Sequence, residues 1–340
     1  MTSIIPLVMQ NLPLPYPDLP YDGKTVIVTG SNTGLGLEAA RHFTRLRAER
    51  VILAVRNLEK GEAAKKLIEG STGRLGVVEC WKLDMNSFAG TEEFIKKAQT
   101  LPRLDVLILN AGLSAGTWRL SPDGWEETLQ VNVLSTALLA LRLLPKMVSS
   151  AKKNPGWTPH LVIVSSGVHA WPSVTSQISE WPSLREQGKF KVFDILNDQQ
   201  KSEKTFVARY PLSKLFDVYV AREIAKLSPT SVLDSAKHIV VVNTLDPGFC
   251  MSELGRECGW DIYFMQLAFA RTTEKGSRVL MDASSKGEQS HGQYLSSCKI
   301  TECAPIVTSD EGKELQKVIW DEILDILEAA SPGSKKLAGL

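Results

Sequence analysis

The sequence predicts an α/β fold in which helices cover both faces of a single, doubly wound parallel sheet of about seven strands. Two observations support this prediction. From Lys24 onward, short runs rich in β-branched residues alternate with amphipathic stretches of helical periodicity. Several of these runs are apolar throughout, as in Val26-Ile27-Val28 and in residues 106–109. Strands without a polar side are typical of sheets that are buried on both faces.

The alternation places the elements in order along the chain. The expected strands cover residues 25–29, 50–55, 77–83, 104–109, 160–165 and 238–244, where β-branched and apolar residues dominate. The expected helices cover residues 35–47, 58–69, 91–100, 122–149 and 209–227, where apolar residues follow helical spacing. A last helix runs through residues 315–327, and Ser331-Pro332-Gly333 ends it because proline and glycine both interrupt helices.

The length of 340 residues allows about two domains, although α/β sheets often extend over about 250 residues as one. Because the alternation continues almost to the end, we expect one domain over residues 23–340. A proline-rich arm over residues 1–22 precedes it, kept extended because proline fixes φ. The polar, proline-containing stretch 171–205 interrupts the alternation, and we expect an insertion there, beside the carboxyl edge of the sheet.

Composition argues against several classes of function. The 39 Lys and Arg residues nearly balance the 38 Asp and Glu residues, so no basic excess predicts a nucleic-acid partner. The five cysteines form no C-x-x-C pair, which argues against a disulfide framework and a metal site. No apolar run approaches the roughly 20 residues that span a bilayer, and the start lacks a signal peptide's basic region. We expect a cytoplasmic protein with reduced thiols and no stable membrane insertion.

The first expected strand runs directly into a helix through Thr29-Gly30-Ser31-Asn32-Thr33-Gly34-Leu35-Gly36. Glycines let such a turn tighten and expose its N–H groups, and the start of the helix adds partial positive charge. This combination predicts binding of a dinucleotide pyrophosphate, as in Rossmann domains. The spacing G-x-x-x-G-x-G differs from G-x-G-x-x-G, so a plain strand-to-helix turn is the alternative.

Arg56 follows the second strand, at the position where an NAD-selective fold offers a carboxylate to the ribose 2′-hydroxyl. A guanidinium binds a 2′-phosphate with two hydrogen bonds, whereas a carboxylate repels it. The residue therefore predicts NADP(H) as the cofactor, and a plain surface arginine is the alternative.

Tyr210 and Lys214 stand four residues apart, so they lie on one face of the expected helix 209–227. An ammonium near a phenol stabilises the phenolate, so the tyrosine could exchange protons closer to neutral pH than its reference pKa of about 10. Lowering that pKa to about 7 requires about 4 kcal/mol, which the lysine and an oxidised nicotinamide together could supply. The alternative is an ordinary amphipathic helix surface, because Y-x-x-x-K is common by chance.

Further motifs follow the later strands: Asp84 ends the third, Asn110-Ala111-Gly112 follows the fourth, Ser165-Ser166 the fifth and Pro247-Gly248 the sixth, and Asn132 lies in an intervening helix. Together with the glycine turn and Y-x-x-x-K, this ordered set resembles the short-chain dehydrogenase/reductase family over about residues 24–294. Residues 29–42 and 54–57 are most similar to the retinol-dehydrogenase-like branch and its fungal secondary-metabolism relatives.

The resemblance implies a catalytic tetrad of Asn132, Ser166, Tyr210 and Lys214. Tyr210 would protonate the substrate oxygen as hydride arrives from the nicotinamide, and Ser166 would hydrogen-bond the same oxygen. Lys214 would hold the nicotinamide ribose and lower the pKa of Tyr210, and Asn132 would anchor a proton-relay water at a local break in its helix. The implied cofactor contacts are Gly30, Asn32, Thr33, Gly34, Leu35, Gly36, Arg56, Asp84, Met85, Asn110, Ala111, Gly112, Tyr210, Lys214, Pro247, Gly248 and Ser252.

Three positions depart from the family's pattern. His169 replaces a glycine or small residue three positions after the serine, as it does in retinol-dehydrogenase-like members, and we interpret it as a pocket-wall histidine. Ser165 adjoins Ser166, so the choice of Ser166 rests on the S-x-x-G/H pattern. Ser252 stands where a threonine is usual and keeps the hydroxyl group. None of these changes disables the implied chemistry.

Two segments are candidates for substrate contact. The insertion 171–205 joins two catalytic residues, and its Trp171, Trp181, Phe190 and Phe193 could line a pocket for a bulky apolar substrate or form a small core of their own. Residues 251–273 occupy the family's substrate loop and are rich in apolar residues. A membrane-contact helix is the weaker alternative for this loop, because it has no basic face.

The expected function is reduction of a ketone or aldehyde of a mostly apolar metabolite by NADPH, or the reverse oxidation. The partner is thus a small-molecule carbonyl or alcohol. A redox-neutral isomerase or cyclase on the same scaffold is one alternative, and an NADPH-binding regulator without turnover is another that the intact tetrad disfavours. The helices 122–149 and 209–227 could form a homodimer interface, unless the arm or the insertion covers them.

Overall fold

One eight-stranded sheet organises the chain. The computed structural model describes residues 13–171, 173–174, 191–202, 206, 208–230, 237–251 and 269–340. The strands are β1 (Thr25–Thr29), β2 (Arg50–Val55), β3 (Val78–Lys82), β4 (Val106–Leu109), β5 (His160–Val164), β6 (Val241–Asp246), β7 (Tyr294–Ser296) and β8 (Lys299–Thr301). Their order across the sheet is β3-β2-β1-β4-β5-β6-β7-β8. All neighbours run parallel except the final pair, β7 and β8, which is antiparallel.

The order of the strands changes side at β1: β2 and β3 lie on one side of it, whereas β4 and the later strands lie on the other. In doubly wound sheets, ligands bind outside the carboxyl ends of the strands at such a switch point. The expected fold class is confirmed, with a short β7–β8 hairpin at one edge in addition to the predicted strands.

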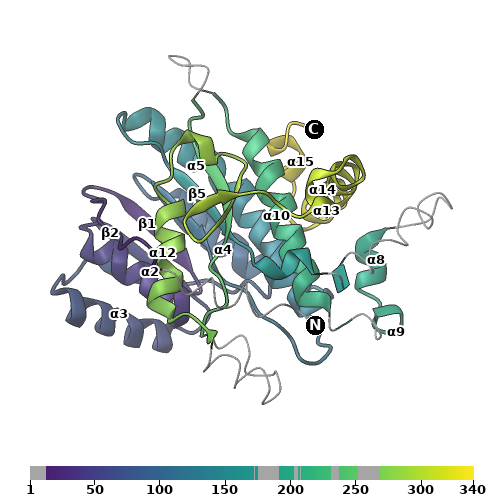
Figure 1. The fold of residues 1–340 in the computed structure, drawn as a ribbon, viewed down its shortest axis with the longest axis horizontal. Helices are drawn as coiled ribbons and strands as arrows, with labels where there is room; N and C mark the ends of the chain where they lie inside the picture. Colours follow the sequence, from purple (N-terminus) through teal and green to yellow (C-terminus); the bar gives the residue numbers. More distant parts are fainter. Residues whose placement is uncertain are drawn as a thin grey trace.

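Helices cover both faces of this sheet (Figure 1). The longer ones are α2 (Gly34–Arg45), α3 (Leu58–Thr72), α4 (Phe88–Gln99), α5 (Thr136–Lys153), α10 (Arg209–Leu227), α12 (Thr273–Ala283) and α14 (Asp310–Ala330). Short helices are η1 (Leu129–Ser135), η2 (Gly167–Ala170), α8 (Val192–Leu196), α9 (Gln199–Ser202), η5 (Glu288–Ser290), α13 (Pro305–Thr308) and α15 (Ser334–Leu337).

The alternation of side chains along β1 divides the core into two. Ile27 contributes to a core with α4, α5, α10 and α14, whereas Val26 and Val28 contribute to the opposite core with α2, α3 and α12. All three side chains are fully buried. Burial on both faces explains why β1 has no polar face, as the sequence pattern indicated.

The predicted helix 122–149 is wrong at its start. Residues 122–126 form a turn, in which the hydroxyl of Ser121 accepts hydrogen bonds from the N–H groups of Asp123 and Trp125, each at 3.2 Å. Such side-chain acceptors compete with helix formation. The helix then passes through η1, which is a π-helix, before α5 continues to Lys153.

Smaller differences concern the ends of elements. α4 begins at Phe88 rather than at residue 91, because Ser87 caps its first turn by accepting a hydrogen bond from the N–H of Gly90. α2 ends at Arg45, and Arg47 has a φ of 69°, which no right-handed helix contains. The sixth strand lies at 241–246 rather than 238–244. The predicted bounds of α10 match the structure.

The segment Leu129–Lys153 is long and apolar enough to cross a membrane, by length and composition alone. However, 78% of its most apolar window is buried inside the protein, between the sheet and neighbouring helices. This is the environment of a core helix in a soluble protein, so the apolar character is explained by packing.

The C-terminal helices cover part of the two long helices that the sequence offered as a dimer interface. α14 lies against α10, where Arg222 donates from Nε to Gln316 Oε1 at 2.8 Å. Ser331 follows the end of α14, and its carbonyl oxygen accepts a hydrogen bond from Nη2 of Arg142 in α5 at 2.8 Å. These contacts come from the C-terminal segment. The insertion also contacts α10, where the ring of Phe193 lies 5.7 Å from that of Phe216.

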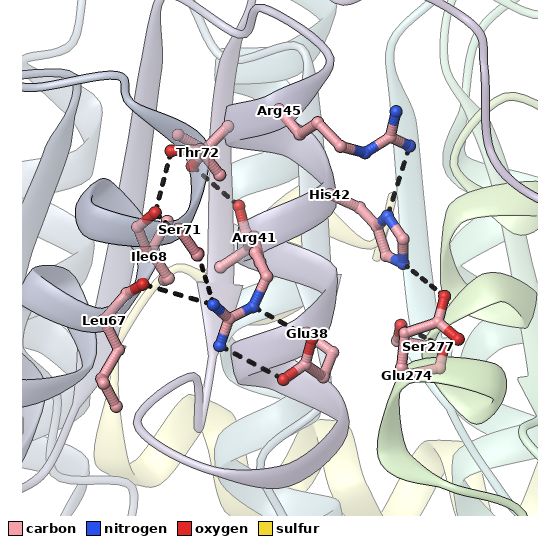
Figure 2. Close-up of polar contacts among 12 residues, drawn as sticks. Glu38, Arg41, His42, Arg45, Leu67, Ile68, Ser71, Thr72, Glu274 and Ser277 are labelled. Carbon is pink, nitrogen blue, oxygen red and sulfur yellow. Dashed lines mark hydrogen bonds and ion pairs between the residues drawn. The ribbon is translucent and has the colours of Figure 1, made fainter.

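Helix α2 is fixed on two sides by polar contacts (Figure 2). Arg41 reaches α3, where Nη1 donates to the carbonyl oxygen of Leu67 at 3.2 Å. His42 points the other way, and its Nε2 lies 3.2 Å from a carboxylate oxygen of Glu274 in α12. The described part of the arm crosses this region, with the ring of Tyr16 against His42. The helix that begins at the glycine turn is therefore held rigidly.

Candidate active site

The predicted site residues converge at the carboxyl ends of neighbouring strands. Gly30 follows β1, Asn110 follows β4, Ser166 lies just beyond β5 and Pro247 follows β6. Because β1, β4, β5 and β6 are adjacent and parallel, these positions meet at one edge of the sheet, at the switch point. The arrangement matches the place where the sequence motifs predicted ligand binding.

The turn between β1 and α2 requires glycine for steric reasons. Gly30 has a φ of 65°, and a Cβ there would lie 3.0 Å from the Cα of Ala111. A Cβ on Gly36 would lie 2.7 Å from both the side-chain nitrogen of Asn110 and the carbonyl oxygen of Gly30. The turn therefore lies directly against the segment after β4, a contact that only glycines allow.

The start of α2 is available to an anion. No side chain caps the helix at Thr33, and a Cβ on Gly34 would meet no other atom within 4 Å. Asn32, Thr33 and Leu35 are partly exposed beside it. Uncapped N–H groups and the helix dipole favour negative charge, so the space and the electrostatics both fit the pyrophosphate of a dinucleotide.

Asn110 holds this turn in place. Its side-chain nitrogen donates to the carbonyl oxygen of Thr29 at 2.9 Å, and its backbone N–H donates to the hydroxyl of Thr29 at 2.9 Å. The N–H of Ala111 donates to the same hydroxyl at 2.9 Å. Asn110 and Ala111 thus join the two strand ends that a bound cofactor would contact.

The residues expected near the adenine end lie after β2 and β3. Arg56 immediately follows β2, is exposed, and makes no ion pair with any of the described residues. Asp84 lies two residues beyond the end of β3 rather than at its last position, and its Oδ1 accepts from the N–H of Asn86 at 3.1 Å. Met85 is buried beside it. The guanidinium of Arg56 is thus exposed at the carboxyl end of β2.

Lys214 is buried and held from two directions. Its Nζ donates to the carbonyl oxygen of Val164, at the end of β5, at 2.9 Å. It also donates to Oδ2 of Asp217 at 2.9 Å. A Cβ on Gly112 would lie 3.5 Å from this Nζ and 3.3 Å from Oδ1 of Asn132, so Gly112 leaves open the space between the two side chains.

Tyr210 lies next to both Lys214 and Ser166. The ammonium of Lys214 is 5.8 Å from the centroid of the phenol ring, and the hydroxyl of Ser166 hydrogen-bonds the Tyr210 side chain. Burial raises the pKa of Tyr210, and Lys214 lowers it by a smaller amount, so the net direction is upward. In the protein without cofactor, Lys214 therefore does not bring the pKa of Tyr210 toward 7.

Asn132 lies in the π-helix η1, which is the local helix break that the resemblance implied. Its side-chain amide makes two hydrogen bonds with the backbone of Leu113, and its Nδ2 also donates to the hydroxyl of Ser213 at 2.9 Å. π segments often mark functional sites, because they reposition one residue relative to its neighbours. The segment joins the loop after β4 to α10.

The two adjacent serines have different surroundings. Ser165 is buried, and its hydroxyl donates to the carbonyl oxygen of Lys214 at 2.7 Å. Ser166 contacts Tyr210 instead, which favours Ser166 as the reacting serine. His169 contacts the carbonyl oxygen of Ser166 through Nδ1 at 2.8 Å, and burial lowers the pKa of this histidine. Its Nε2 is buried and makes no hydrogen bond with the described residues, and its interpretation as a pocket-wall histidine stays a prediction.

Pro247 and Gly248 lie after β6, in a turn that Arg271 fixes by donating to the carbonyl oxygen of Pro247 at 2.9 Å. Ser252 lies outside the described residues, as do residues 252–268 of the substrate loop. In the insertion, Trp181 and Phe190 also lie outside them. Phe193 is buried in the main core against Phe216, at 5.7 Å between ring centroids, so it forms part of the core.

Two carboxylates in the site belong to no motif of the sequence. Asp217 pairs with Lys214, and its position three residues later on the same helix is a local signal. Asp246 is the last residue of β6, and its oxygens accept from the N–H of Gly248 at 2.9 Å and from the hydroxyl of Ser296 at 3.3 Å. Both carboxylates raise the pKa of Tyr210.

A separate cluster of metal-ligand types joins His238, Glu288 and His291. However, Nδ1 of His291 accepts from the N–H of Val242 at 3.2 Å, and its Nε2 lies 3.0 Å from the carbonyl oxygen of Ala225. Both ring nitrogens are therefore engaged, which leaves His291 without a lone pair for an ion. The cluster is better described as a hydrogen-bonded group than as a metal centre.

Comparison with known proteins agrees with this geometry. A family model described as short chain dehydrogenase matches residues 24–174. The chain is 44% identical to the short chain dehydrogenase/reductase dmxR8 of Cryptosporiopsis sp., over 94% of this chain and 95% of that protein. It is 38% identical to the short-chain dehydrogenase anuD of Penicillium roqueforti, over 94% of this chain and 81% of that protein.

Among solved structures, the fold is similar to that of a 3-oxoacyl (acyl-carrier-protein) reductase from Agrobacterium tumefaciens, with a TM-score of 0.58 and 21% identity. That similarity covers 82% of this chain and 93% of the other. The switch-point site and the sequence relatives therefore show that this protein belongs to the short-chain dehydrogenase/reductase family, within its fungal branch.

Proposed function

We propose that the protein is an NADP(H)-dependent oxidoreductase that reduces a ketone or aldehyde of a mostly apolar small metabolite, or oxidises the corresponding alcohol. The observation that carries this proposal is the convergence of Tyr210, Ser166 and Lys214 beside the glycine turn. A phenol, a hydroxyl and an ammonium at one place provide a proton donor, an oxygen-binding group and a positive charge.

Each of these residues has one part in the chemistry. When bound, the reduced nicotinamide supplies the hydride. Tyr210 donates the proton to the substrate oxygen, and Ser166 hydrogen-bonds that oxygen as negative charge develops on it. Lys214 has one N–H beyond those given to Val164 and Asp217, and this N–H would hold the nicotinamide ribose. Asn132, which lies in the π-helix η1, anchors a proton-relay water.

The cofactor preference rests on Arg56. Its exposed guanidinium, free of ion pairs with the described residues, lies at the end of β2, where the adenosine ribose binds in doubly wound folds. Support also comes from the Agrobacterium reductase of similar fold, whose structure has NADP bound. We propose further cofactor contacts at the same edge of the sheet, from the glycine turn, Asp84, Met85, 110–112 and 247–248. The contact proposed for Ser252 rests on the sequence alone.

The expectations of one domain over 23–340, a cytoplasmic location and a homodimer stay predictions. Because α14 and α15 contact α10 and α5, a dimer would need a surface other than the covered parts of those two helices.

The proposal is tested by following the absorbance of reduced nicotinamide with a panel of apolar ketones and aldehydes. We expect NADPH oxidation by the wild type and its loss in Tyr210→Phe, with NADPH binding retained, because that change removes only the proton donor. Substrate conversion without NADPH oxidation would instead identify a redox-neutral isomerase or cyclase. NADPH binding without conversion of any member of the panel would favour a regulator.

A further inference from the structure

Asp217 is a buried carboxylate that no motif of the family names. It lies one helical turn after Lys214 on α10, and 1% of its surface is exposed. Its Oδ2 accepts from the Lys214 ammonium at 2.9 Å, while its Oδ1 is buried and accepts no hydrogen bond from the described residues. A carboxylate is thus held inside the protein mainly by one lysine.

This contact fixes what Lys214 can do. An ammonium has three N–H donors, and two of them point to Val164 O and to Asp217 Oδ2, both at 2.9 Å. These two acceptors come from β5 and from α10 itself, so they determine both the position and the rotation of the ammonium. One donor remains, and Gly112 leaves space open between the ammonium and the side chain of Asn132.

Stability does not explain the pair. Removing two charges from water costs several kcal/mol for each ion, and buried pairs are often no more stable than apolar residues of the same volume. This cost applies to Asp217 and Lys214, since 1% and 4% of their surfaces are exposed. An apolar residue at position 217 would satisfy the packing but would leave Lys214 free to rotate.

We propose that Asp217 is a positioning residue for the reaction: it aims the last N–H of Lys214 at the nicotinamide ribose, and its charge sets the pH at which Tyr210 exchanges its proton. This inference rests on the proposed function, because it assigns Asp217 a part in the same site.

The charges around Tyr210 support the second half of this proposal. Burial is the largest influence and raises the pKa of Tyr210; Lys214 lowers it, while Asp217 of α10 and Asp246 of β6 raise it. Burial also raises the pKa of Asp217 to about 6, and Lys214 opposes this rise. For Lys214, burial lowers the pKa but the carboxylate of Asp217 outweighs it, so the net direction is upward. Asp217 therefore keeps Lys214 charged and at the same time offsets part of its effect on the phenol.

The test is a pH titration of tyrosinate absorbance in the NADP⁺ complex, comparing wild type with Asp217→Asn. Subtracting the titration of Tyr210→Phe isolates the signal of Tyr210 from the other tyrosines. The amide keeps the shape of the side chain and removes its charge, which acts on Tyr210 directly and through the charge of Lys214, so we expect the Tyr210 titration to move by about one pH unit from its wild-type position. Affinity for NADP⁺ should fall, because Lys214 loses an anchor.

Glu223→Gln provides the matched control, since Glu223 is another largely buried acid on α10 that pairs with Lys226 and Gln316 instead of Lys214. It should leave the Tyr210 titration at its wild-type position. Coincident titrations of Asp217→Asn and wild type would overturn the proposal, as would an equal shift in Glu223→Gln.

If Asp217→Asn does not fold, Asp217→Glu replaces it. This variant keeps the charge but displaces Lys214, so the Tyr210 titration should stay near that of wild type while NADP⁺ affinity falls. Unchanged NADP⁺ affinity would overturn the positioning role. Neither titration nor binding requires a carbonyl substrate, so failure of this inference is distinguishable from failure of the proposed function, which turnover alone decides.

Discussion

The guanidinium Nε of Arg209 lies 3.6 Å from Oε2 of Glu126, and both side chains are fully buried. Glu126 also accepts hydrogen bonds from the N–H groups of Thr128 and Leu129, at 2.9 and 3.2 Å. The guanidinium of Arg209 makes no hydrogen bond with any described residue, and burial lowers the pKa of Arg209 to about 10. The ion pair connects the residue before Tyr210 to the start of the helix that carries Asn132.

Glu126 has other hydrogen bonds, whereas the Arg209 guanidinium has none. We therefore expect the loss of Glu126 and the loss of Arg209 to lower the free energy of unfolding by different amounts. Glu126→Gln leaves a buried guanidinium without its counter-charge and should destabilise the protein by about 3 kcal/mol or more. Arg209→Met should cost less, because the remaining carboxylate keeps two backbone hydrogen bonds. Urea unfolding of both variants measures the difference. Equal losses, or a larger loss in Arg209→Met, would show that the charge of Glu126 does not hold Arg209.

We expect the protein to lose stability in weak acid because His42 is buried. Burial lowers the pKa of this histidine from 6.5 to about 4, and neighbouring Glu274 opposes this only partly. Between these two pH values the unfolded chain binds a proton that the folded protein does not, so stability falls as the pH decreases through this window. The loss attributable to His42 is at most on the order of 3 kcal/mol.

His42→Gln removes that proton from both states. The difference in unfolding free energy between pH 7 and pH 5 should therefore be smaller in His42→Gln than in wild type. Urea unfolding at the two pH values measures it, and parallel losses in the two proteins would contradict the assignment to His42.

We expect Arg56 to make the protein bind NADPH in preference to NADH. Arg56→Asp should weaken NADPH binding by about tenfold or more, which corresponds to about 1.4 kcal/mol, because a carboxylate repels the 2′-phosphate. Binding of NADH should weaken much less. Lys299→Asp, on the exposed strand β8, changes the net charge equally and should leave both affinities unchanged. Fluorescence titration with the two cofactors measures all three proteins, and an equal loss for NADPH and NADH in Arg56→Asp would be incompatible with this role.

Local signals explain which parts of the fold the sequence predicts. β1 and the glycine turn follow from runs of a few residues. α10 matches its predicted bounds, although it is buried on almost all sides and so has little amphipathic periodicity. The start of the predicted helix 122–149 is wrong because the hydroxyl of Ser121 fixes a turn there, which the spacing of apolar residues does not reveal. The hairpin of β7 and β8 is missed because each strand has three residues, too few for a pattern.

The site divides in the same way. The positions of Ser166, Tyr210 and Lys214 follow from motifs. The net rise in the pKa of Tyr210, however, depends on burial and on Asp246, which lies on β6 rather than on the helix of Tyr210. Likewise, the second anchor of Lys214 is a carbonyl oxygen of β5, fifty positions away along the chain. Such contacts depend on how distant elements pack, and no local pattern encodes them.

The central claim is that Tyr210 protonates a substrate oxygen while hydride leaves NADPH at this site. The most direct measurement is single-turnover transfer of deuterium from C4-deuterated NADPH to a carbonyl substrate, in wild type and in Tyr210→Phe. The account predicts deuterium on the carbinol carbon with the wild type, and at least a hundredfold slower transfer in Tyr210→Phe, in line with the roughly 10²–10⁴ that positioned proton transfer supplies. Transfer at the wild-type rate in Tyr210→Phe, with NADPH equally bound, would contradict it.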